Sequence, residues 1–87
     1  ELEGADLDGA NLGGSDLTYV SFRFASLKGA SLKGAKLHNA DFSKADLTGA
    51  DLSGADVKDA DFDGAILTDV KGLERLAGRE RARNLSQ

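Results

Sequence analysis

The sequence predicts an all-β solenoid, in which the chain turns a corner every five residues and packs each coil against the next. Three observations predict this fold class. An apolar residue recurs at every fifth position from Leu2 to Leu67, fourteen times without exception. From Ala5 onward a small residue precedes each of these central positions by two, and it is alanine throughout from Ala25 to Ala65. A period of five fits neither the helical period of about 3.6 nor the strand period of about 2, so only regular corners keep these residues inside.

The clearest copies of the repeat read Ala-Asp-Leu-x-Gly, as at residues 5–9 and 50–54. This motif resembles the pentapeptide-repeat family, and the resemblance covers residues 1–70. It implies a right-handed quadrilateral parallel β-helix in which four pentapeptides make one coil. We therefore expect residues 1–70 to form a pentapeptide-repeat solenoid of about three and a half coils.

The spacing of the phenylalanines supports a coil of twenty residues. Phe22, Phe42 and Phe62 are each twenty positions apart, and Leu2 continues the series. In coils stacked about 4.8 Å apart, residues twenty positions apart lie above one another. The sequence therefore predicts an aromatic ladder inside one face of the solenoid.

Glycines after the central positions also separate by corner. Two corners carry stacked glycines, at Gly9, Gly29 and Gly49 and at Gly14, Gly34 and Gly54, whereas a third carries Tyr19, Asn39 and Asp59. Glycine suits a turn that needs positive φ. We expect type II turns at the glycine corners and a different turn at the corner of Tyr19.

The five-residue register ends at Val70, and a helical pattern follows. Leu73, Leu76 and Ala77 share one face of that pattern. We expect an α-helix over roughly residues 72–84 that lies across the last coil, because solenoids need terminal caps. Residues 71–87 would then form a C-terminal helical cap and basic tail. The N-terminal coil shows no cap, so either further sequence precedes it or its open edge pairs with a partner or a second copy.

Charge is banded by coil. Residues 1–20 carry five acids and no base, and residues 41–60 carry five acids against two bases. Between them lies a band of four bases without an acid, here called the basic belt: Arg23, Lys28, Lys33 and Lys36. One stack reads Asp16, Lys36, Asp56, and unlike charges on neighbouring strands stabilise. The belt is first interpreted as relief of acidic columns, with a binding band for an anionic partner as the alternative.

Neither the composition nor the spacing predicts an enzyme, a metal site or a cofactor. The chain has no cysteine, and its single histidine, His38, occupies an outward position without a catalytic partner. Stacked aspartates such as Asp41 and Asp61 offer oxygen ligands for calcium, but calcium-binding β-rolls have a glycine-rich period of about nine residues. We interpret these aspartates as solvated surface charges, and the basic tail as the outer face of the cap rather than a nucleic-acid or membrane contact.

No apolar run approaches the roughly 20 residues of a membrane span. No signal peptide is visible, but the chain begins at Glu1 without a methionine, so the sequence leaves the compartment open.

Two aromatic residues depart from the repeat. Tyr19 and Phe24 occupy adjacent outward corners where glycine is usual, beside the basic belt, and exposed aromatics commonly anchor interfaces. The candidate interaction surface therefore comprises Tyr19, Arg23, Phe24, Lys28, Lys33 and Lys36. The sequence predicts a non-enzymatic structural or protein-interaction module, with a protein and not a nucleic acid as partner.

The family resemblance also implies an alternative function. Its quinolone-resistance members resemble an acidic DNA duplex and protect DNA gyrase. Those are long dimeric rods, whereas about three and a half coils span only some 17 Å, and the basic belt interrupts an acidic surface. DNA mimicry is therefore the second interpretation.

Overall fold

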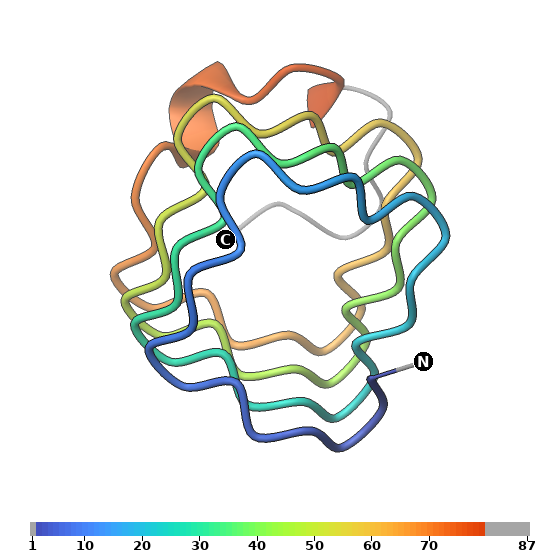
Figure 1. The fold of residues 1–87 in the computed structure, drawn as a ribbon, viewed down its shortest axis with the longest axis vertical. Coiled ribbons are helices and arrows are strands. Elements are labelled where there is room, and N and C mark those ends of the chain that lie inside the picture. The colour runs from blue at the N-terminus through green and yellow to red at the C-terminus, as the bar shows by residue number, and fades with distance from the viewer. Residues whose placement is uncertain (1, 80–87) are drawn as a thin grey trace.

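A computed structural model describes residues 2–79. The chain winds into stacked coils, which Figure 1 shows one behind another. Eleven parallel β-bridges join neighbouring coils among the described residues, and ten of them pair residues twenty positions apart, from Asp6 with Ser26 to Asp51 with Lys71. The twenty-residue spacing predicted from the phenylalanines is therefore confirmed. Pairing in residues 2–79 consists of single-residue bridges, and the one helix there is the 3-10 helix η1 (Leu73–Arg75).

Backbone hydrogen bonds connect the coils and close the corners. The N–H of Leu7 donates to the carbonyl of Ser26 at 2.7 Å, and the N–H of Ser26 donates back to Ala5 at 2.9 Å. Each of the fourteen central residues from Leu2 to Leu67 also accepts a bond from the N–H three positions later. This is the bond of a β-turn, and it recurs in every pentapeptide.

The corners share one conformation, so the expectation of a different turn at Tyr19 is wrong. All fourteen residues two positions after a central residue have positive φ, between 58° and 72°. Six of them are not glycine: Tyr19, Phe24, Asn39, Lys44, Asp59 and Asp69. The reason is that every corner closes the same four-residue β-turn, which imposes the left-handed conformation whatever the side chain. Asn and Asp tolerate it through local hydrogen bonding, but aromatic side chains bear a cost.

The core is a narrow column of central apolar residues and alanines. From Phe22 to Leu67 these residues are buried, whereas Leu2, Leu7, Leu12 and Leu17 of the first coil are only partly buried. The ring centroids of Phe22 and Phe42 lie 4.8 Å apart and those of Phe42 and Phe62 lie 5.0 Å apart, each pair within 3° of parallel. The predicted aromatic ladder is therefore present.

The C-terminal segment differs from the predicted α-helix over residues 72–79. After η1, Leu76 is extended (φ −71°, ψ 132°) and Ala77 pairs with Asp56, one residue beyond the twenty-residue register. Gly72 stands where the next central residue is due and has φ 86°. A Cβ at this position would lie only 2.7 Å from the Cα of Ser53, so the position favours glycine. The tight turn that it starts takes up the extra residue.

Continued pairing is favoured over a helix because it satisfies the edge of the third coil. The N–H of Val57 donates to the carbonyl of Ala77 at 2.9 Å, a partner that a helix would not supply. Leu76 is buried and Leu73 packs partly buried against the core, so this segment covers the last coil without an α-helix. Residues 80–84 of the predicted helix lie outside the described residues. No helix within residues 2–79 has the length and apolar character needed to cross a membrane.

Candidate interaction surface

At eight of the positions before a central residue, an Asp or Asn side chain stabilises the local turn. The Oδ1 atom of Asp51 accepts a hydrogen bond from the backbone N–H of Ser53 at 2.9 Å. The same bond, at 2.9–3.2 Å, is made by Asp6, Asn11, Asp16, Asp41, Asp46, Asp56 and Asp61. Hydroxyls of Thr18, Ser43 and Thr48 donate to the same oxygen at 2.6 Å. This structural role was not expected from the sequence, although Asp followed two residues later by Ser or Thr is a signal for it.

The basic belt surrounds the second coil and does not gather on one surface. Arg23 follows the central residue Phe22, Lys28 follows Leu27 and Lys33 follows Leu32, whereas Lys36 precedes Leu37. These central residues belong to four successive sides of the coil, so each base projects from a different side. All four side chains are exposed.

Acidic groups of the neighbouring coils accompany the belt. The guanidinium of Arg23 lies 3.5 Å from Asp41 Oδ2. Asp8 Oδ1 accepts bonds from Ser26 Oγ at 2.5 Å and from the backbone N–H of Lys28 at 2.9 Å. The Arg23–Asp41 contact supports the interpretation that the belt relieves acidic columns, whereas the bonds to Asp8 come from a hydroxyl and a backbone N–H.

Hydrogen bonds, aided by the belt, lower the pKa of several aspartates. For Asp16, Asp46 and Asp51 the main cause is the bond from the following Thr or Ser hydroxyl, with smaller contributions from Lys36, Lys28 and Lys33 respectively. Burial raises the pKa of Asp41, but the bonds from Ser43 and the charge of Arg23 outweigh it and the pKa is lowered. The pKa values of Asp8 and Asp56 are lowered too, mainly by the hydrogen bonds from Ser26 and His38 respectively.

Acid is therefore expected to destabilise the fold. A carboxyl whose folded pKa lies below its unfolded value of 3.8 contributes stability that is full above that value and is lost as the pH falls through the folded pKa. The urea midpoint should stay level near neutrality and fall steeply below about pH 4. The triple variant Asp16→Asn/Asp46→Asn/Asp51→Asn keeps the turn-forming oxygen, as Asn11 does, and should give a flatter profile. An acid slope identical to that of the parent would contradict this account.

Tyr19 and Phe24 are the most exposed large apolar side chains in residues 2–79, at 72% and 62%. They bracket the segment Val20–Arg23, which crosses one side of the second coil. Both hold the left-handed corner conformation, with φ of 65° and 61°. The guanidinium of Arg23 lies 5.7 Å from the centroid of the Phe24 ring, a cation–π contact. The structure thus brings Arg23 and Phe24 together, while Lys28, Lys33 and Lys36 lie on other sides.

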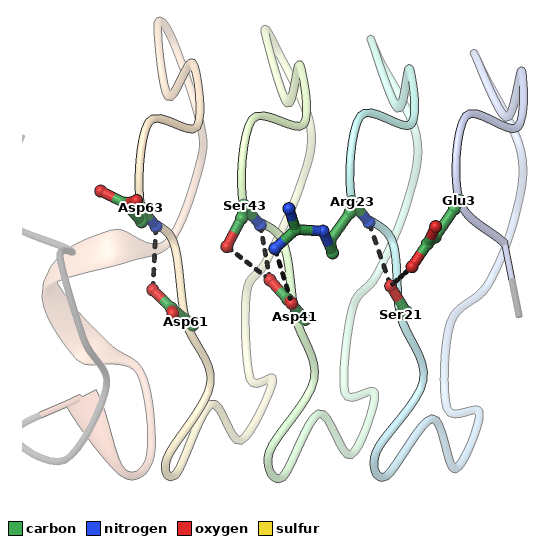
Figure 2. Close-up of polar contacts among 7 residues, drawn as sticks. All are labelled: Glu3, Ser21, Arg23, Asp41, Ser43, Asp61 and Asp63. Atoms are coloured by element: carbon green, nitrogen blue, oxygen red, sulfur yellow. Dashed lines mark hydrogen bonds and ion pairs between the residues drawn. The ribbon is translucent and has the colours of Figure 1, made fainter.

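The surface between these two corner columns is here called the acidic face. Figure 2 shows its outward side chains in two parallel columns across the coils, one with Glu3, Arg23, Ser43 and Asp63 and the other with Ser21, Asp41 and Asp61. Ser21 Oγ donates to Glu3 Oε2 at 3.1 Å, and the N–H of Asp63 donates to Asp61 Oδ1 at 3.0 Å. Four carboxylates thus share the face with a single guanidinium.

The other candidates from the sequence have structural partners. His38 is partly exposed, and its Nε2 lies 2.7 Å from Asp56 Oδ2. Arg79 donates to the carbonyl of Leu73 at 2.6 Å, whereas Arg81 and Arg83 lie outside the described residues. No group of three or more potential metal-ligating side chains occurs within the part of the chain that the structure describes.

Comparison with known proteins identifies the repeat. The profile of the family described as pentapeptide repeats matches residues 1–34 and 30–69, with eight copies. A pentapeptide repeat protein from the Arabidopsis thaliana thylakoid lumen is 48% identical, with a TM-score of 0.78 over 79% of this chain and 48% of its own. The pentapeptide repeat protein Rfr23 of the cyanobacterium Cyanothece 51142 is 28% identical, with a TM-score of 0.78 over 92% of this chain and 50% of its own.

A third similar structure is QnrB1, a plasmid-mediated fluoroquinolone resistance protein, at 27% identity and a TM-score of 0.56 over 71% of this chain and 35% of its own. This chain therefore spans about half or less of the length of these three proteins. A search of curated proteins gives no match. The profile match across residues 1–69 and the 48% identity show that the chain belongs to the pentapeptide-repeat family.

Proposed function

We propose that this chain is a non-enzymatic protein-interaction module, which uses rigid solenoid sides to present side chains to a protein partner. The observation that carries the proposal is the pair Tyr19 and Phe24. Each holds a left-handed corner, where a residue other than glycine costs about 1–3 kcal/mol, yet each is mostly exposed and adds little to the core. Exposed aromatic side chains contribute most to binding free energy when a partner buries them.

The proposed interaction surface comprises Tyr19, Arg23 and Phe24 at its centre. Lys28, Lys33 and Lys36 stay in the proposal as peripheral charges, because they project from the other sides of the same coil.

We also propose the handedness and cross-section of the solenoid and the boundary of its C-terminal segment. Family membership and the ladder of parallel bridges support a right-handed quadrilateral β-helix over residues 1–70, followed by a distinct C-terminal segment over residues 71–87. We also propose that the first coil, whose leucines are only partly buried, offers its edge for self-association.

DNA mimicry is the second candidate, and similarity to QnrB1 is what favours it. The basic belt counts against it, because four exposed bases encircle the second coil between the acidic bands. If mimicry were the function, the variant Arg23→Glu/Lys28→Glu/Lys33→Glu/Lys36→Glu should inhibit DNA gyrase better than the parent.

The test of the proposed function compares two pairs of corner substitutions. Tyr19→Gly/Phe24→Gly removes both aromatics and relieves left-handed strain, so the urea midpoint should hold or rise. Affinity capture followed by mass spectrometry should show loss of the partner, because aromatic anchors commonly contribute about 2 kcal/mol or more, roughly thirtyfold in affinity.

The matched control is Asn39→Gly/Lys44→Gly, which changes the same two corners one coil further on, where φ is 59° and 63°. It should capture the same partner as the parent. Equal capture by the parent and by both variants would refute the proposed surface.

A further inference from the structure

We propose that the acidic face, together with Tyr19 and Phe24 on its two borders, binds an arginine-bearing extended segment of a partner protein. This inference rests on the proposed function and specifies the chemistry of the partner. It differs from the alternative interpretation of the basic belt, a binding band for an anionic partner.

The position of the two aromatics selects this side of the solenoid. Tyr19 precedes Ser21 by two residues and Phe24 follows Phe22 by two, so the rings stand at the two edges of one side. A segment that crosses the acidic face of the second coil meets one ring at each edge. The other exposed large apolar residue described, Ile66 at 48%, lies two coils away in the stack of Ser26 and Asp46.

The charge between the rings selects a basic partner. Glu3, Asp41, Asp61 and Asp63 lie on the acidic face with Arg23, and Lys44 stands at its border in the column of Phe24. By formal charge these four acids outnumber the two bases, and Arg23 lies 3.5 Å from Asp41. An anionic segment would place like charges together on this side, whereas a cationic one would complement it.

The contact between Arg23 and Phe24 indicates which cation suits the rings. A guanidinium lies 5.7 Å from the Phe24 centroid, so the ring and the neighbouring carboxylate of Asp41 together accommodate this group. Arginine stacks on aromatic faces and binds carboxylates in a bidentate manner, whereas the compact ammonium of lysine does neither as well. This face thus already holds one guanidinium between a ring and a carboxylate, and Tyr19 offers a second exposed ring at the other edge.

The experiment uses three synthetic peptides of equal length and identical spacing: Arg-Gly, Lys-Gly and Glu-Gly repeats. Binding to the whole chain is measured by calorimetry. Tyr19 is the only tyrosine and the chain has no tryptophan, so intrinsic fluorescence reports directly on the border of the face. We expect the Arg peptide to bind, to perturb Tyr19 fluorescence and to weaken with salt, the Lys peptide to bind less tightly, and the Glu peptide not to bind.

Two variants test the two parts of the site. Tyr19→Gly/Phe24→Gly should weaken the Arg peptide about thirtyfold. Glu3→Gln/Asp41→Asn, which neutralises the carboxylates in the two coils next to the rings, should weaken it about tenfold, equivalent to about 1.4 kcal/mol. Asn39→Gly changes the corner in the column of Tyr19 without changing the charge, so it is the control and should bind as the parent does. Urea midpoints establish that each variant is folded.

The outcomes separate this inference from the proposed function. Capture of a native partner through the aromatics, without binding of the Arg peptide, would overturn the inference and leave the interaction module standing. Tighter binding of the Glu peptide would overturn it in favour of an anionic partner. Loss of aromatic dependence in both the capture and the peptide experiments would overturn both proposals.

Discussion

Replacing Phe42 by alanine is expected to lower the free energy of unfolding by about 3–5 kcal/mol. Phe42 is fully buried and stacks between two rings, with centroid distances of 4.8 Å and 5.0 Å. The substitution leaves a cavity in the middle of the ladder, and the coils above and below are held at their spacing by backbone bonds, so the cavity cannot close easily. Urea denaturation of parent and variant measures the change.

The matched control is Phe24→Ala. Phe24 stands at the corner two residues after Phe22, in the coil next to that of Phe42, but its side chain is 62% exposed. Its replacement should change stability by less than about 0.5–1 kcal/mol. Equal losses for Phe42→Ala and Phe24→Ala would contradict the assignment of the ladder as core.

Replacing Ala45 by leucine is expected to destabilise the fold by about 1–3 kcal/mol through overpacking. Ala45 is fully buried in the third coil, and its carbonyl and N–H bond to Ile66 and Phe42, so the backbone has little freedom to move outward. A larger side chain would push against the central column. The urea midpoint and amide hydrogen exchange of the neighbouring residues measure the effect.

Ala5→Leu controls for the size of the side chain. Ala5 occupies the same repeat position in the first coil but is only partly buried. The added volume extends toward the open side of that coil, so a smaller loss is expected. If Ala5→Leu destabilised as much as Ala45→Leu, the cause would lie outside interior packing.

The periodic part of the fold was predictable because the same local rule recurs in every repeat. A central apolar residue, an alanine and a corner together imply both the burial of Leu47 and Ala45 and the stacking of Phe22 on Phe42. The exposure of Tyr19 and Phe24 follows from the same rule, because both stand at outward corner positions.

Two predictions were wrong: the helix after the end of the repeat, and the different turn at the corner of Tyr19, which was inferred from the lack of glycine at that corner alone. A helix over residues 72–84 agreed with the local pattern of Leu73, Leu76 and Ala77. It did not account for the unpaired edge of the third coil, which pairs with Ala77 instead. The corner of Tyr19 was expected to differ because it lacks glycine, but the shared turn bond imposes the same φ there.

The sequence by itself determined the twenty-residue coil, the aromatic ladder and the outward position of the aromatic pair, because these depend only on spacing along the chain. Only the tertiary structure decided which charges meet. Arg23 and Asp41 are eighteen residues apart, and the belt residues project from separate sides, so their grouping depends on how the coils stack. The acidic face likewise combines residues from four coils, and it exists only because a parallel stack places them in two adjacent columns.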